Sequence, residues 1–256
     1  MHRIQLTLPL SFVALAIWMG LTLSGRWLQP GSPPATLAAS VADGIGLPWV
    51  LAALFALALL LASSRRRAAG LGMPAPARTV WLAGPPLLYA LLMLLLAWAG
   101  GWPQPAILLV VACNTALVAI SEELMFRAIL LQGMMERLAI WPAVLISSLL
   151  FGMAHTVNGL SMGDFGGALW QAAAAAMQGI GYAAIRLRTR SAWPMVLVHG
   201  LWDFALVTAM LSTPSQGEVS VLPYAALLAV LPLCLYGAWL LRPSQRAALS
   251  CSATVV

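Results

Sequence analysis

Residues 107–131 read ILLVVACNTALVAISEELMFRAILL, and this stretch decides the fold class. A helix needs about 20 consecutive, mostly apolar residues to cross about 30 Å of hydrocarbon. Within a bilayer the backbone must satisfy its hydrogen bonds inside the protein, which limits spanning structures to helices and closed barrels. Because long continuous apolar runs select helices, we expect a membrane-spanning helix here.

The remainder of the chain has the same character. Of its 256 residues, 62% are hydrophobic and only 8% are charged, far outside the range of soluble domains. The sequence therefore predicts an all-α polytopic integral membrane protein with about eight transmembrane helices in one bundle. The other seven predicted spans are 5–24, 46–63, 84–102, 139–157, 165–187, 192–212 and 221–241. The first span, which follows Arg3, resembles a signal peptide, but no small-residue cleavage pattern follows it, so we expect it to be retained.

All thirteen basic residues are arginines, and most of them lie between the apolar runs rather than along one polar face. This pattern indicates membrane topology and predicts no nucleic-acid partner. The arginines follow the even-numbered spans, while the loops after the odd-numbered spans hold only Arg26. Because cytoplasmic loops carry an excess of arginine, both termini are predicted to be cytoplasmic. The cysteines Cys113, Cys234 and Cys251 show no metal-like spacing and predict no disulfide framework.

Ionisable residues interrupt two of the predicted spans. Glu122, Glu123 and Arg127 lie inside the quoted stretch, and His199 and Asp203 lie inside the seventh span. Each Glu, Asp or Arg at a helix centre costs about 2.5 to 3.5 kcal/mol, so four cost on the order of 10 kcal/mol before pairing. Such residues mark a functional site facing the bundle interior or a cavity.

Helical spacing predicts how the residues of the quoted stretch are arranged. Glu123 and Arg127 stand four apart with the acid first, the favourable order for an ion pair. Glu122 lies about 100° further around the helix, on a polar stripe with Asn114 and Thr115, and is free to face a cavity.

The histidines lie on other spans. His199 and Asp203 are four apart and share one helix face, and His155 ends the fifth span. A rise of about 1.5 Å per residue places Glu122 about 15 Å, His155 about 20 Å and His199 about 10 Å from the cytoplasmic ends. Straight helices would not bring them together, so tilt or a break in the fourth span is needed. Gln171 and Gln178 are interpreted as glutamines that bridge helices.

Two kinds of water activation fit this set. A carboxylate in a low-dielectric pocket can take a proton from water with the help of a histidine, while a second histidine donates hydrogen bonds to an oxyanion. Alternatively, two histidines and a carboxylate with an open fourth position form a catalytic zinc site. The zinc-protease signature HExxH is absent, and the sequence leaves the metal undetermined. The zinc candidates are Glu122, His155 and His199.

Three short motifs occur in order, EELMFR at 122–127, FGMAH at 151–155 and HGLWD at 199–203. They resemble the EExxxR, FxxxH and HxxxN or HxxxD motifs of the CPBP family, also called Abi proteins. That family comprises CAAX prenyl endopeptidases and bacteriocin-processing enzymes. Each motif alone has little specificity, whereas three in order within predicted spans are fairly specific.

The resemblance implies an intramembrane endopeptidase acting on a peptide or membrane-protein substrate. Glu122 with His155 would activate water, and His199 with Asp203 would stabilise the oxyanion. Asp203 stands where the eukaryotic prenyl-protein enzymes have Asn. Because an ionised Asp donates no hydrogen bond, Asp203 is either protonated or orients His199 instead.

The resemblance also implies that Glu123 and Arg127 support the catalytic geometry. It divides the chain into N-terminal transmembrane helices with a linker at 1–100, a catalytic core at 101–212, and a C-terminal transmembrane helix with a short tail at 213–256. Two other readings remain open. A proton-coupled transporter uses similar residues but predicts inverted repeats, which the sequence lacks. A non-catalytic immunity or scaffold protein would be expected to lack the carboxylate that activates water.

Overall fold

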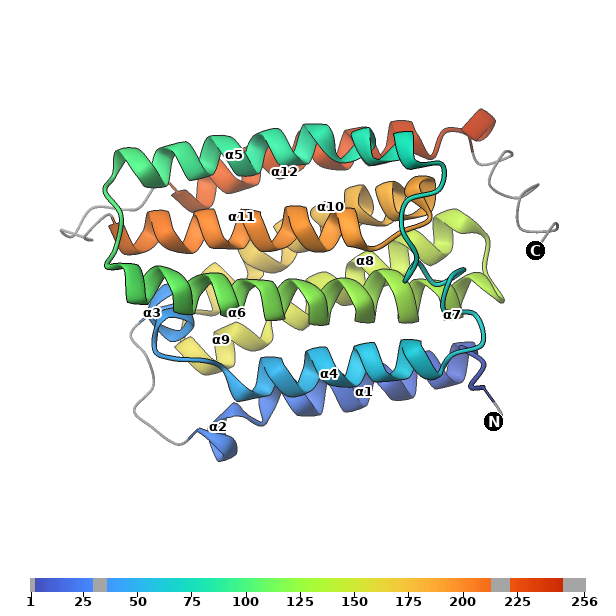
Figure 1. Ribbon diagram of the computed structural model, residues 1–256, viewed down its shortest axis with the longest axis horizontal. Coiled ribbons are helices and arrows are strands. Elements are labelled where there is room, and N and C mark those ends of the chain that lie inside the picture. Colours follow the sequence, from blue (N-terminus) through green and yellow to red (C-terminus); the bar gives the residue numbers. More distant parts are fainter. Residues whose placement is uncertain (1–2, 30–35, 213–221, 246–256) are drawn as a thin grey trace.

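Long apolar helices make up nearly all of this structure. The computed structural model describes residues 3–29, 36–212 and 222–245. Within these ranges there is no strand, and the one β-type contact is an isolated parallel bridge between Ile4 and Ser63. Figure 1 shows the long helices running along a common direction as one bundle.

The helices have the following bounds in chain order. They are α1 (Leu8–Leu23), α2 (Gly25–Leu28), α3 (Leu37–Ala42), α4 (Leu47–Ala62), the 3-10 helix η1 (Ala77–Ala83), α5 (Gly84–Ala99), α6 (Pro105–Glu123), the π-helix η2 (Leu124–Leu130), α7 (Leu131–Met135), α8 (Ile140–His155), α9 (Val157–Met162), α10 (Phe165–Thr189), α11 (Trp193–Ser212) and α12 (Leu222–Leu240).

Each of the eight predicted spans overlaps one of the long helices. By length and composition, four helical segments can cross a membrane, and shorter apolar helices accompany them. The all-α, membrane-embedded fold is therefore confirmed, while the number of eight spans stays a prediction. The four segments are Ala77–Ala99, Pro105–Met135, Ile140–Gly159 and Trp193–Ser212.

Helix starts follow from local sequence. Proline stands in the first turn of α1, α4, α5 and α6, where its missing N–H is not needed and its fixed φ suits a helix. Thr7 caps α1 by accepting a hydrogen bond from the backbone N–H of Leu10. Asp164 caps α10 in the same way through the N–H of Gly167, at 2.9 Å.

The helices pack as a chain of neighbours across the bundle. α1 lies beside α4, α4 beside α6, α6 beside α11, and α11 beside α5, while α10 packs between α8 and α12 (Figure 1). The α8–α10 contact depends on small residues, because a side chain at Gly152 would lie 2.5 Å from the carbonyl oxygen of Ala172. Close backbone approach of this kind is a common way for membrane helices to associate.

The centre of the bundle is the π-helical segment η2. All seven of its residues are buried, and it packs against α1, α4, α8 and α10. Apart from Arg127 its residues are apolar on every side, and a helix of that character belongs in an interior. π-helical turns are rare in proteins, and those that do occur are often found at functional sites. Here the π-helix begins at the residue after Glu123, so the fourth predicted span is interrupted beside the two glutamates.

One end of the bundle gathers the arginine-bearing segments. α1 begins and α12 ends at this end (Figure 1). Arg65 after α4 pairs with Glu136 after α7 at 3.1 Å. Arg186 near the end of α10 donates to the carbonyl oxygen of Ala68 at 2.6 Å. This arrangement has the one-sided charge that the topology prediction requires, and the cytoplasmic location of that end stays a prediction.

Candidate functional site

The site begins where α6 ends. Glu122 and Glu123 are its last two residues, and they differ in exposure. The Glu123 side chain is fully buried, whereas 15% of the Glu122 side chain is exposed. One carboxylate is therefore enclosed by protein, and its neighbour can be reached from the surface.

The ion pair predicted between Glu123 and Arg127 is present. Nε of Arg127 lies 3.4 Å from Oε2 of Glu123, and both side chains are almost completely buried. The guanidinium lies over the ring of Phe151, 3.9 Å from its centroid. Among the described residues, neither terminal nitrogen of Arg127 has a hydrogen-bond partner. The cation is thus held by one carboxylate and by an aromatic face.

His199 on α11 contacts all three carboxylates of the site. Its Nδ1 lies 2.9 Å from Oε1 of Glu123. Its Nε2 lies 3.3 Å from Oδ2 of Asp203 and 3.7 Å from Oε2 of Glu122. The predicted shared face of His199 and Asp203 is therefore confirmed, and the direct contact of His199 with Glu123 is an additional finding.

The relative depths of these residues differ from a straight-helix estimate. That estimate separated Glu122 from His199 by several ångströms, yet their carboxylate and imidazole atoms are 3.7 Å apart. The side chains meet beside η2, where the regular α-helix of the fourth span is interrupted.

His155 is the last residue of α8. Its Nδ1 lies 2.9 Å from the carbonyl oxygen of Phe151, and because a carbonyl only accepts, Nδ1 carries the proton. In the neutral ring, Nε2 then presents a lone pair. The imidazole packs against the ring of Phe151 at 4.8 Å and lies close enough to Glu122 to interact electrostatically with it.

The polar stripe predicted along α6 is only partly associated with the site. Asn114 turns away, because its amide donates to the carbonyl oxygens of Val41 and Gly44 and accepts from the N–H of Gly46. Its role is to fix the segment between α3 and α4. Thr115 bonds back to carbonyls of its own helix. Helical spacing alone does not reveal that a loop from another part of the chain binds this asparagine.

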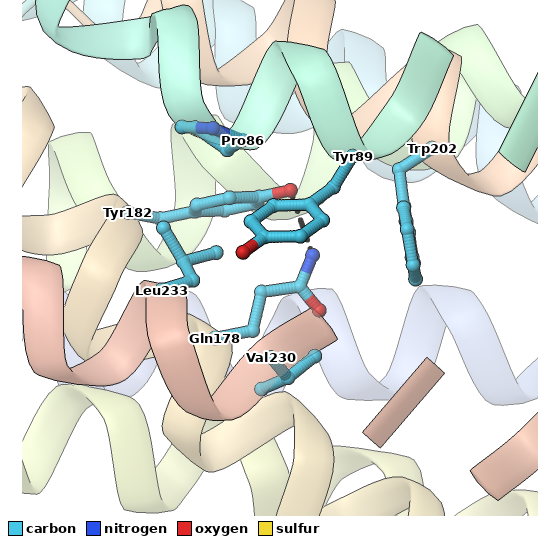
Figure 2. A pocket seen from close by; sticks show the side chains of 7 residues that line it. All are labelled: Pro86, Tyr89, Gln178, Tyr182, Trp202, Val230 and Leu233. Carbon is cyan, nitrogen blue, oxygen red and sulfur yellow. Dashed lines mark hydrogen bonds between the residues drawn. The ribbon is translucent and has the colours of Figure 1, made fainter. Parts of the chain in front are cut away.

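Tyr182 of α10, next to His199, was not among the predicted site residues. Its ring lies 5.7 Å from the imidazole of His199 and 5.7 Å from the guanidinium carbon of Arg127. Figure 2 shows Gln178 reaching toward the Tyr182 hydroxyl, to which its amide donates at 2.7 Å, with Tyr89 from α5 lying across them. Gln178 thus supports a ring of the site within its own helix and does not bridge helices as expected.

Gln171 has the bridging role expected of it. Its carbonyl oxygen accepts a hydrogen bond of 2.8 Å from Asn158 on α9, so it links α9 to α10.

Tyr182 also lines a small cavity. Its volume of about 10 Å³ has room for about one water molecule. Its lining residues are Pro86, Tyr89, Gln178, Tyr182, Trp202, Val230 and Leu233 (Figure 2). A peptide side chain would not fit there without movement of these residues.

The zinc alternative fits this arrangement poorly. Within the described residues, no group of three or more His, Cys, Asp or Glu side chains is arranged to hold a metal ion. His199 has carboxylate oxygens at both ring nitrogens, so in this position it offers no nitrogen to a metal. Of the three zinc candidates, Glu122 and His155 keep an available atom. Two ligands fall short of the three protein ligands of catalytic zinc sites.

Comparison with known proteins gives one family. Residues 103–205 match a family model described as type II CAAX prenyl endopeptidase Rce1-like. No curated protein and no solved structure shows a significant match to the chain. The matched segment contains all three motifs and runs from the start of α6 into α11. The match confirms the suspected resemblance: residues 103–205 of this membrane protein are similar to the Rce1-like type II CAAX prenyl endopeptidases.

Proposed function

We propose that this protein is an intramembrane endopeptidase of the CAAX type that hydrolyses a peptide bond with water activated by Glu122. One observation carries the proposal. Carboxylates from two helices converge on the buried imidazole of His199, and the partly exposed Glu122 is one of them. Burying ionisable groups inside an apolar helix bundle costs free energy, so such groups usually belong to a functional site. The match to the prenyl endopeptidase family supports the same activity.

Glu122 is suited to act as the general base. Its Oε2 is buried and has no hydrogen-bond partner among the described residues, while 15% of the side chain is exposed, so the carboxylate keeps an acceptor for the proton of a water that enters the site. His155 supports this step, because its bond to the Phe151 carbonyl leaves Nε2 able to accept a hydrogen bond from the same water. The water oxygen would then attack the substrate carbonyl, and the proton held by Glu122 would pass to the leaving amine.

His199 is suited to stabilise the tetrahedral intermediate. Its Nδ1–H is directed at Glu123, which fixes the ring orientation. A proton on Nε2 would be positioned beside Glu122, where the oxyanion forms. Asp203 contacts that same nitrogen at 3.3 Å, which supports the orienting role for Asp203 over direct donation to the oxyanion.

Glu123 and Arg127 would hold this arrangement without touching substrate. Glu123 accepts a hydrogen bond from His199 through Oε1 and forms an ion pair with Arg127 through Oε2, so its two carboxylate oxygens face two different elements. Both side chains are buried. Their proposed role is to keep His199 in place, because removal of either would release the imidazole.

The test is hydrolysis by the purified protein in detergent. The substrates are fluorogenic peptides ending in a CAAX box, with and without the prenyl group, and one unprenylated transmembrane peptide. Glu122→Gln should abolish turnover. Glu136→Gln is a matched control, since this acid lies outside the site and pairs with Arg65. A zinc chelator should leave the rate unchanged.

The outcomes separate the alternatives. Loss of turnover in Glu122→Gln alone supports the proposed base. Equal cleavage by wild type and Glu122→Gln would show that the catalytic assignment is wrong, and proton transport would then be measured in liposomes. Inhibition by the chelator, reversed by zinc, would refute the metal-free mechanism while leaving the endopeptidase activity in place.

A further inference from the structure

The first helix, α1, lies outside the segment that matches the family, yet it contacts the catalytic helix directly. Trp18 of α1 is 3% exposed, and its Nε1–H donates to the hydroxyl of Ser121 at 2.9 Å. Ser121 is 1% exposed and immediately precedes Glu122. A buried hydrogen bond therefore joins α1 to the residue beside the proposed base.

A second contact leads from Trp18 to the histidine side of the site. The Trp18 ring packs edge-on against Phe126 of η2 at 5.3 Å. Phe126 packs against Phe151 at 5.0 Å, and Phe151 packs against His155 at 4.8 Å. Edge-to-face aromatic pairs at these spacings stabilise packing beyond simple burial. Three successive ring contacts thus connect α1 to the second proposed catalytic residue.

The other end of η2 is also held by α1. A side chain at Gly133 of α7 would lie 2.5 Å from the hydroxyl oxygen of Ser11, so the Ser11 side chain packs directly against the backbone of α7. Ser11 is fully buried. Ser121 and Gly133 stand on opposite sides of Leu124–Leu130, and α1 therefore supports the π-helix at both of its ends.

We propose that α1 is a structural component of the active site and that Trp18 is a positioning residue for Glu122 and His155. The proposal rests on the endopeptidase function proposed above. A π-helix is a rare conformation, and η2 keeps its register because neighbours hold it on every side. Trp18 fixes the start of that segment through Ser121 and Phe126, and so fixes the direction in which the Glu122 carboxylate points. The first span therefore remains attached in the active protein.

The test compares Trp18→Phe with Ser121→Ala and with their double variant. Trp18→Phe keeps an aromatic ring but removes the N–H, and Ser121→Ala removes the acceptor of the same bond. Trp27→Phe is the matched control, because Trp27 is 77% exposed. The kcat and KM of each variant are measured well below its thermal midpoint in detergent.

We expect each single variant to lower kcat about tenfold with KM unchanged, since a misplacement of about 1 Å at a catalytic group can cost about 10²-fold. The double variant should be no worse than the worse single variant, because both changes remove one bond. The control should keep the kcat and KM of wild type. If Trp18→Phe does not fold, the kcat and KM of Ser121→Ala alone test the positioning role.

A second readout needs no substrate. In protein with ¹⁵N-labelled histidine, the Nδ1 proton resonance of His155 should shift in Trp18→Phe and stay in place in Trp27→Phe. Unchanged kcat in both folded single variants, with an unchanged His155 resonance, would overturn the positioning role. A loss of activity seen as raised KM alone would also overturn it. If wild type cleaves no peptide, the proposed function fails, and the resonance still decides whether α1 positions His155.

Discussion

Replacing Arg127 with Met should destabilise the protein strongly, because it leaves a buried carboxylate without its cation. Glu123 has no exposed surface, and Arg127 is only 2% exposed. Methionine keeps much of the side-chain length and apolar stem. The substitution therefore removes the charge and the face-on contact with Phe151 while disturbing packing little.

The size of the effect follows from burial. Removing one partner of a buried ion pair costs about 3–5 kcal/mol in soluble proteins. In membranes, polar contacts are worth less, because the unfolded protein also finds partners in the bilayer. We therefore expect Arg127→Met to lower the free energy of unfolding by about 3 kcal/mol, the lower end of that range. For a chain of this size that corresponds to a fall of roughly 6–12 °C in the thermal midpoint.

The assay is unfolding of purified protein in mixed micelles, followed by circular dichroism, together with a thermal melt. The double variant Arg127→Met with Glu123→Gln removes both charges and should recover much of the lost stability. Arg65→Met is the matched control. Its pair with Glu136 is solvent-exposed, so its loss should cost under about 1 kcal/mol. A free energy of unfolding for Arg127→Met as close to wild type as that of the control would refute the reasoning.

Asp203→Asn should keep kcat within a few-fold of wild type and Asp203→Ala should lose at least about tenfold, because the asparagine oxygen can still accept from Nε2 of His199. Equal losses in steady-state hydrolysis would contradict an orienting role. Gly152→Ala should lower the free energy of unfolding by about 1–3 kcal/mol through overpacking, since the new methyl would lie 2.5 Å from the carbonyl oxygen of Ala172. Gly20→Ala, which meets no atom within 4 Å, is the control and should be neutral or stabilising. A reporter enzyme that is active only in the cytoplasm should be active when fused to either terminus. An inactive fusion at both ends would reverse the predicted orientation.

Local helix geometry accounts for the part of the site that the sequence predicts. Glu123 with Arg127, and His199 with Asp203, are each four residues apart, and both contacts are found in the structure. Such pairs depend only on the periodicity of a helix. For the same reason, the apolar windows locate the long helices well.

Contacts between helices depend on how the helices pack against one another, and the sequence pattern of one helix does not contain that information. The bond from His199 to Glu123 joins residues 76 positions apart in the chain. Tyr182 was missed because a tyrosine in an apolar run carries no signal of its own until its neighbours are known. Asn114 was expected beside Glu122 on a shared stripe, but a loop supplies three backbone partners for its amide group. In each case the partner on another element decides the role.

The charges themselves argue against a purely structural ion-pair network. Three carboxylates, those of Glu122, Glu123 and Asp203, surround His199, while Arg127 is the one guanidinium in contact with them among the described residues. With all three carboxylates ionised, one negative charge stays unbalanced even when both nitrogens of His199 carry a proton. A network built only for stability would be expected to neutralise it, because an unpaired buried charge is costly. The surplus belongs to a cluster whose member Glu122 is partly exposed and has an oxygen without a hydrogen-bond partner in the described structure. A proton-accepting role gives that oxygen a use that bundle stability does not.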